Sequence, residues 1–222
     1  MPAHDVTVQT SDAQLEGQLA MFSGATAVVA FAHGSGSSRH SPRNKAVADE
    51  LNRSGIATLL FDLLTPQEES VDNVTAQQRF DIDLLTTRLT GAVDWLADNV
   101  DNKDTEETPI GLFGASTGAA AALRTAAERP DVVQAVVSRG GRPDLAGTTA
   151  LQEVHAPTLL IVGERDTAVL GMNEEAADRL EGPNRIHIVP RATHLFEEIG
   201  AMEEVASAAS EWFVKILGER ER

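Results

Sequence analysis

Residues 109–128 read PIGLFGASTGAAAALRTAAE, and this stretch indicates how the chain folds. The apolar run Ile110 to Phe113 predicts a short strand, and the alanine-rich run Ala119 to Glu128 predicts a helix. Between them lies Gly114-Ala-Ser-Thr-Gly118, a G-x-S-x-G pattern that lets a strand turn sharply into a helix. Glycine fits both flanks because a Cβ there would crowd the neighbouring strand and helix. Ser116 is therefore a candidate nucleophile; the alternative is a small-residue turn that packs a helix close to a sheet.

Apolar strands and helices alternate along the rest of the chain, after an N-terminal strand pair. The predicted strands are Asp5 to Gln9, Leu15 to Met21, Thr26 to Ala32, Ile56 to Asp62, Val133 to Ser138, Thr158 to Val162 and Arg185 to Val189. One predicted helix runs from Ser41-Pro42 to near Ser54-Gly55, and another runs from Asn173 to Leu180. Two helices are predicted from apolar residues that share one face: Phe80, Leu84, Leu85, Leu89, Ala92, Val93 and Leu96 in the first, and Met202, Val205, Ala209, Phe213 and Ile216 in the helix that closes the chain. A polar loop is predicted from Asp101 to Thr108. This order predicts an α/β fold with one domain, residues 1–222, and a mostly parallel sheet of about eight strands with helices on both faces.

Composition excludes several classes of function. The 222 residues include 34 acidic and 18 basic side chains, a formal net charge of −16 that would repel nucleic acid and anionic membrane surfaces. No cysteine is present, which excludes disulfides, thiolate metal sites and a cysteine nucleophile. No apolar run approaches the ~18 residues of a membrane helix, and His4 and Asp5 do not suit a secretory signal, so we expect a cytoplasmic protein. The scarcity of lysine among the basic residues fits either a salt-adapted host or a GC-rich genome.

A serine nucleophile needs a base that accepts its proton and an acid that orients the base. His194 is the candidate base, because it lies just past the last predicted strand, at the sheet edge where the turn at Ser116 is expected. Asp166 is the candidate acid, since it follows the strand Thr158 to Val162 by a few residues, with Glu164 as the near competitor. Ordinary surface or packing roles are expected for the other histidines: His4, His33, His40, His155 and His187.

Two backbone N–H donors are needed to stabilise the oxyanion of an acyl-transfer reaction. Thr117, at the start of the helix after Ser116, is the first candidate, and Ser35, in the loop His33 to Ser38, is the second. Phosphate binding is the competing interpretation of this glycine-containing loop, but Arg39 stands where a G-x-G-x-x-G motif needs its third glycine. His33 is expected to form structural hydrogen bonds.

With these residues in place, the chain resembles the α/β-hydrolase superfamily, and within it the compact dienelactone-hydrolase-like proteins. The order Ser116, Asp166, His194 matches that of the family. The segments that carry the resemblance further are Phe61-Asp-Leu-Leu-Thr65, Arg79-Phe-Asp-Ile-Asp-Leu-Leu85, Ser138-Arg-Gly-Gly-Arg-Pro-Asp144 and Ala192-Thr-His-Leu-Phe-Glu-Glu198. True dienelactone hydrolases use a cysteine where this chain has Ser116, so dienelactone is not carried over as a substrate. The resemblance implies a cofactor-free serine hydrolase that acts on an ester.

The segment Arg139 to Ala156 is too short to contain a lid domain, which favours small ester substrates. Arg139 and Arg142 lie at the carboxyl edge of the sheet and are candidates for binding a substrate carboxylate; the alternative is pairing with an acidic neighbour such as Asp144. A non-catalytic binding or regulatory module stays open, as do thioesterase, peptidase and perhydrolase activities, which need the same groups. A small-molecule ester is the expected partner, and a homo-oligomer is possible.

Overall fold

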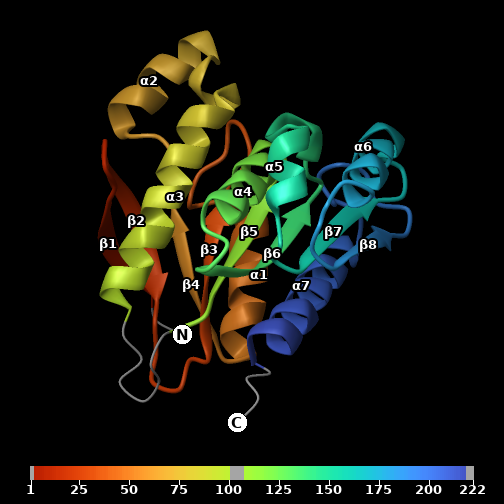
Figure 1. Ribbon diagram of the computed structural model, residues 1–222. Coiled ribbons are helices and arrows are strands. Elements are labelled where there is room, and N and C mark those ends of the chain that lie inside the picture. Colours follow the sequence, from red (N-terminus) through yellow and green to blue (C-terminus); the bar gives the residue numbers. More distant parts are fainter. Residues whose placement is uncertain (1–2, 101–107, 219–222) are drawn as a thin grey trace.

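The computed structural model describes residues 3–100 and 108–218, and its centre is one eight-stranded sheet (Figure 1). The strands are β1 (His4–Gln9), β2 (Gln14–Ala20), β3 (Ala27–Ala32), β4 (Ile56–Phe61), β5 (Ile110–Ala115), β6 (Val133–Arg139), β7 (Thr158–Gly163) and β8 (Asn184–Val189). They follow the order β1-β2-β4-β3-β5-β6-β7-β8, in which β2 is antiparallel to both its neighbours and the other pairs are parallel. Strands β3, β4, β5 and β7 are buried throughout, as expected of a parallel sheet covered on both faces. The predicted mostly parallel sheet is confirmed.

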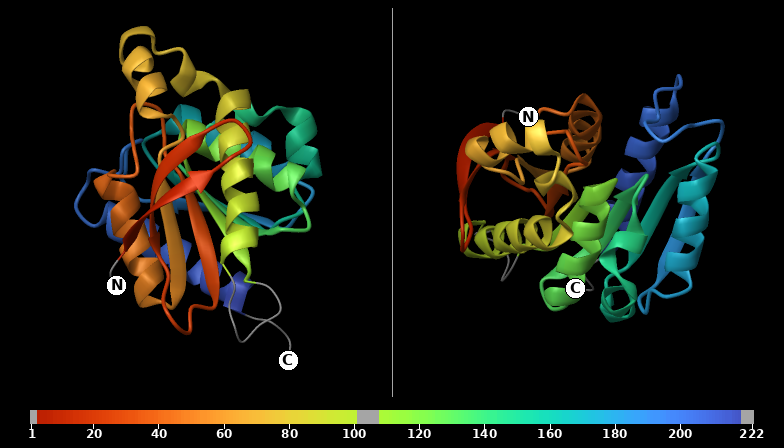
Figure 2. Two further views of the ribbon diagram at one scale, coloured as in Figure 1. Left: turned by 90° about the vertical axis from the view of Figure 1, so that its left-hand side faces the viewer. Right: turned by 90° about the horizontal axis from the view of Figure 1, so that it is seen from above.

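Helices cover both faces of the sheet, as the sequence predicts (Figure 2). They are α1 (Pro42–Arg53), α2 (Pro66–Thr75), α3 (Ile82–Asn99), α4 (Thr117–Glu128), α5 (Thr148–Glu153), α6 (Thr167–Ala177) and α7 (Ala201–Gly218), with 3-10 turns η1 (Gln78–Phe80) and η2 (Pro143–Ala146). Helices α1 and α7 pack on one face, while α3 and α4 pack on the other. Within the described residues, no helix is long and apolar enough to cross a membrane.

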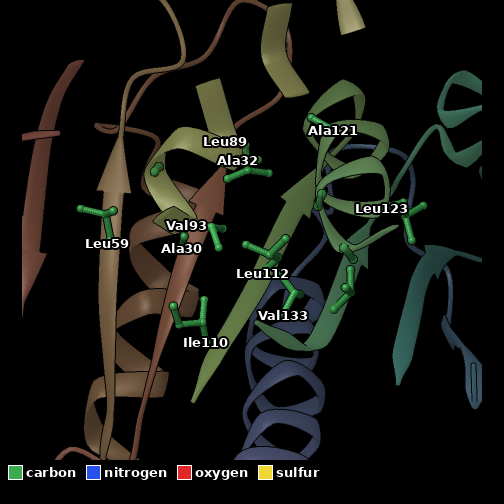
Figure 3. Packing of buried hydrophobic residues seen from close by; sticks show 14 of the residues in the cluster. Ala30, Ala32, Leu59, Leu89, Val93, Ile110, Leu112, Ala121, Leu123 and Val133 are labelled. Atoms are coloured by element: carbon green, nitrogen blue, oxygen red, sulfur yellow. The ribbon is translucent and has the colours of Figure 1, made fainter. Parts of the chain in front are cut away.

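Two apolar clusters hold these layers together, one on each face. In Figure 3, Leu89 and Val93 of α3 approach Ala30, Ala32 and Leu112 of the central strands. The predicted stripe of α7 is confirmed, since Val205, Ala209 and Phe213 are buried and Met202 and Ile216 pack against the same cluster. Close helix packing on β3 and β5 is possible because the facing side chains are small, with a run of four alanines in α4.

Three details differ from the sequence prediction. Phe80 lies in η1 and is 57% exposed, because α3 begins only at Ile82, after Asp81 caps its first turn. Helix α6 begins at Thr167 rather than at Asn173. Helix α2 was not predicted and projects beyond the edge where the parallel strands end (Figure 1). The predicted polar loop Asp101 to Thr108 lies outside the described residues except for Thr108.

The turn from β5 into α4 is the tightest approach of a helix to the sheet. A Cβ on Gly118 would lie 2.2 Å from the carbonyl oxygen of Ala32, and one on Gly114 would lie 2.5 Å from the Cα of Ala119. Both distances are far below van der Waals contact and involve backbone, which cannot move aside cheaply. The predicted crowding by strand β3 and helix α4 is therefore confirmed at both glycines.

We expect Gly118→Ala to destabilise the fold by at least about 2 kcal/mol, because the added methyl group forces α4 away from β3. Gly171→Ala in α6 is the matched control: nothing lies within 4 Å of its added Cβ, so helix propensity alone should raise stability by about 1 kcal/mol. Urea denaturation of both variants measures the two effects. Equal stability of the two variants would contradict the packing described for the turn.

Candidate active site

Ser116 lies at the bend between β5 and α4, in a backbone conformation that residues with a side chain rarely adopt. Its φ is 51° and its ψ is −119°, a combination that costs on the order of 1–3 kcal/mol and has to be held by its surroundings. Ser116 N–H donates to the carbonyl of Arg139 at 3.2 Å, and the Ser116 carbonyl accepts from Arg142 N–H at 3.2 Å. These two hydrogen bonds hold the bend against the end of β6 and the segment that follows it.

Asp166 and His194 meet at the same edge of the sheet. The Nδ1 atom of His194 lies 2.6 Å from Oδ2 of Asp166, whose side chain is 15% exposed. A carboxylate only accepts hydrogen bonds, so Nδ1 carries a proton, and in the neutral imidazole Nε2 is the nitrogen with the lone pair. Nε2 makes no hydrogen bond to any described residue. The imidazole is therefore oriented as a base whose accepting nitrogen is free.

Tight packing after β7 and β8 brings these two side chains together. A Cβ on Gly163 would lie 2.4 Å from the carbonyl oxygen of Ala192, and Arg165 N–H donates to the same carbonyl at 2.9 Å. Glu164, the competing acid, instead accepts the N–H of Arg191 at 2.6 Å. Asp166, and not Glu164, is the partner of His194.

Ser116 and His194 line one pocket of about 190 Å³, called the Ser116 pocket below. Its lining comes from the loop after β3, the start of α1, and the ends of β5, β6 and β8: Gly34, Ser35, Ser37, Ser41, Arg43, Ser116, Arg139, His194 and Leu195. Gly34 approaches the serine closely, since a Cβ on Gly34 would lie 3.2 Å from Cβ of Ser116. The loop predicted to supply an oxyanion donor thus lies directly against the candidate nucleophile.

The two predicted oxyanion donors border this region from different elements. Ser35 lines the Ser116 pocket, whereas Thr117 is 3% exposed and lines an adjacent pocket together with Ser35. Thr117 N–H belongs to the first turn of α4 and has no acceptor within the helix. No hydrogen bond from either N–H to another described residue occurs. The hydrogen-bonding capacity of both N–H groups is therefore unused within the described part of the chain.

His33 holds the loop that carries Ser35. Its Nε2 accepts the N–H of Leu63 at 3.1 Å, so Nδ1 carries the proton and donates to the carbonyl of Gly34 at 3.0 Å. That carbonyl also accepts from Ser37 N–H. In a trans peptide, the N–H of Ser35 must point away from the Gly34 carbonyl, so these bonds also fix the direction of that N–H. The expected structural role of His33 is confirmed.

The two candidate arginines lie in different surroundings. Arg142 forms a two-point pair with Asp144, with Nε to Oδ1 at 2.8 Å and Nη2 to Oδ2 at 2.7 Å, which is the alternative that the sequence left open. Arg139 is 7% exposed, lines the Ser116 pocket and stacks over the ring of Phe196, 5.7 Å from its centroid. Of these two candidates, Arg139 lines the Ser116 pocket and Arg142 does not.

Sequence reasoning missed Arg43, which also lines the Ser116 pocket. A signal was present: Ser41 and Pro42 predict a helix start, and that helix follows the candidate oxyanion loop within a few residues, so its first turn had to lie near the site.

The described residues contain no group of three histidine, aspartate or glutamate side chains arranged to hold a metal ion.

Comparison with known proteins gives the family. Residues 25–212 match the family described as alpha/beta hydrolase domain, and the chain belongs to it. A dienelactone hydrolase from Anabaena variabilis has the same fold, with a TM-score of 0.92 and 56% sequence identity over 97% of this chain and 98% of that one. An esterase from Pyrococcus furiosus superposes with a TM-score of 0.76 at 21% identity, over 98% of this chain and 92% of that one, which is a likeness of fold alone. The fold is dienelactone-hydrolase-like, and the family match together with the Anabaena variabilis relative supports a hydrolase.

The name of one curated relative describes a transferase and not a hydrolase. A Mycobacterium tuberculosis protein called "Putative phosphoribosyl transferase" is 51% identical over 213 residues, which are 96% of this chain and 46% of that protein. The chain thus spans about half the length of the curated relatives it matches. That name describes a protein twice as long.

We expect His33 to make the fold less stable at mildly acidic pH. Burial lowers the pKa of its imidazole below the ordinary value of 6.5. Below about pH 6.5 the unfolded chain therefore binds a proton that the folded chain does not, and the free energy of unfolding falls as the pH falls. In His33→Gln this contribution is absent, so the difference in stability between wild type and variant should shrink from pH 7.5 to pH 5. Urea titrations at several pH values measure it, and parallel curves would contradict it.

Proposed function

We propose that the chain is a serine hydrolase that cleaves small carboxylic esters through an acyl-enzyme intermediate. The observation that carries the proposal is the 2.6 Å hydrogen bond from His194 to Asp166, in which the oriented imidazole lines the same pocket as Ser116. A turn that only packs a helix against the sheet does not require a strained serine in the same pocket as an oriented histidine. The pairing of an oriented base with a partly exposed serine in the same pocket favours nucleophilic catalysis.

In the first step, Nε2 of His194 takes the proton of the Ser116 hydroxyl as its Oγ attacks the ester carbonyl carbon. The negative charge on the carbonyl oxygen is stabilised by the N–H groups of Ser35 and Thr117. Asp166 stabilises the imidazolium that forms. The C–O bond to the alcohol then breaks, His194 protonates the leaving oxygen, and Ser116 holds the acyl group.

In the second step, His194 takes a proton from water as the water oxygen attacks the acyl carbon. The tetrahedral intermediate collapses, the carboxylic acid leaves, and the proton returns to Ser116. The α4 dipole, positive near Thr117, favours the anionic intermediate in both steps.

The dimensions of the site favour small acyl groups. The Ser116 pocket of about 190 Å³ is below the ~300–1,000 Å³ that holds drug-sized ligands. Between β6 and β7 the chain forms only η2 and the six-residue α5, so this segment supplies no lid. Helix α2 projects nearby, but none of its residues lines the Ser116 pocket. A long lipid chain would find little apolar surface here.

We expect Ser116→Ala to lower kcat for a small ester such as 4-nitrophenyl acetate by about 10⁶ and Asp166→Asn by about 10⁴, because the first removes the nucleophile and the second the orienting acid. Glu164→Gln is the matched control, since it removes a carboxylate of the same loop that accepts the N–H of Arg191 and not a bond from His194; its kcat should stay within about threefold of wild type.

Steady-state hydrolysis by the four proteins, with circular dichroism to check folding, measures the series. Equal activity of Ser116→Ala and wild type would overturn the proposal. A folded wild type that cleaves none of a panel of esters and thioesters with varied acyl length would favour the non-catalytic binding module instead.

A further inference from the structure

Arg139 is a buried cation for which the described residues provide no counterion. It is the last residue of β6 and is 7% exposed, yet within the described residues its guanidinium forms no hydrogen bond and no ion pair. Its contact is with the face of the Phe196 ring. Burying a charge in this way is costly unless a partner compensates it.

Another buried arginine of this chain has its charge compensated by carboxylates. Arg88 of α3, whose side chain is 4% exposed, donates to Asp12 at 3.0 Å and to Glu68 at 2.7 Å. Arg139 has no such carboxylate, and burial together with the positive charge of Arg43 lowers its pKa to about 10. The structure therefore leaves one buried guanidinium with its hydrogen-bonding capacity unused.

Arg43 adds a second positive charge to the same pocket. It lies in the first turn of α1, and its Nη1 is 3.8 Å from Oε1 of Glu197, a carboxylate that is 70% exposed. Its Nε is buried without an acceptor. In a chain with a net charge of −16, the lining of the Ser116 pocket contains two arginines and no aspartate or glutamate.

We propose that Arg139 and Arg43 form an anion subsite of the Ser116 pocket, which binds a carboxylate on the acyl part of the substrate. This inference rests on the proposed function and narrows its substrate class to half-esters of short dicarboxylic acids. The planar guanidinium of Arg139 matches a carboxylate in two-point geometry. A carboxylate is also smaller than a phosphate group, and the pocket of about 190 Å³ must hold the ester as well.

The reaction leaves the bound carboxylate unchanged. Water adds across the ester C–O bond, the alcohol leaves with one proton, and the new carboxyl group loses another to solvent, so that a dicarboxylate is formed. Binding of the first carboxylate would hold the acyl chain while the ester carbonyl lies at Ser116. The products carry two negative charges in place of one.

The first experiment compares mono-4-nitrophenyl glutarate with its methyl-capped diester, which differs by one negative charge and one methyl group, at 0.15 M salt and with spontaneous hydrolysis subtracted. Wild type should prefer the anionic ester at least tenfold in kcat/KM. Arg139→Met should reduce this preference by about 10- to 100-fold, mainly through KM, because it removes charge-assisted hydrogen bonds. Arg43→Met should reduce it less, since Arg43 is more exposed.

Arg129→Met is the matched control, because Arg129 pairs with Asp94 outside the pocket; it should keep the wild-type preference. The melting temperature of Arg139→Met should not fall, since the variant loses an unpaired buried charge, whereas an arginine that only supported the fold would lower it. A wild type without preference for the anionic ester, or a preference that survives in both Arg139→Met and Arg43→Met, overturns the subsite.

Direct binding separates this inference from the proposed function. Calorimetry with Ser116→Ala should show that glutarate binds and that the additional change Arg139→Met weakens binding at least tenfold. If esters are cleaved but glutarate does not bind, the subsite fails and the hydrolase stands. If glutarate binds through Arg139 but no ester is cleaved, the subsite stands and the hydrolase fails. Inorganic phosphate binding more tightly than glutarate would overturn the carboxylate assignment.

Discussion

The close contact between the β5–α4 turn and the end of β3 is the constraint on which the rest of the molecule depends. Because Gly118 lies against the carbonyl of Ala32, α4 starts directly beside the loop that follows β3. The same contact brings Gly34 against Ser116 and leaves the N–H groups of Ser35 and Thr117 at one edge of the sheet. A single steric requirement, two glycines without side chains, thus places the candidate nucleophile and both candidate oxyanion donors.

Electrostatics in the site contrast with those of the whole chain. Acidic side chains outnumber basic ones by 34 to 18, and carboxylates pair with arginines elsewhere, as Asp12 and Glu68 do with Arg88. The lining of the Ser116 pocket, in contrast, has only cationic charge. Asp166 lies behind His194, where it orients the ring without entering the pocket lining. Charge is therefore separated over a short distance, with the acid on the far side of the base and two arginines on the side where a substrate would bind.

Most of the fold followed from the sequence because its signals were local: apolar runs mark β3, β5 and β7, and G-x-S-x-G marks the turn at Ser116. Helix α2 was missed although Thr65 and Glu68 form a capping box and Pro66 follows the cap, because only Asp72 of the helix is buried and its sequence has no apolar stripe. The start of α6 was misplaced because Gly171 weakens the helical pattern. Pairing of Asp166 with His194, and of Arg142 with Asp144, was anticipated as a possibility; the burial of Arg139 without a partner and the proximity of Arg43 depend on tertiary packing.

The central claim is that Ser116 is an activated nucleophile, and covalent labelling tests it most directly. A fluorophosphonate reacts with a serine only where a base and an oxyanion site assist the attack. Peptide mass spectrometry of the labelled folded protein should find one adduct, on Ser116, which is absent in Ser116→Ala and forms far more slowly in His194→Gln. An unlabelled folded wild type, or an adduct that forms at the same rate without His194, would contradict the assignment.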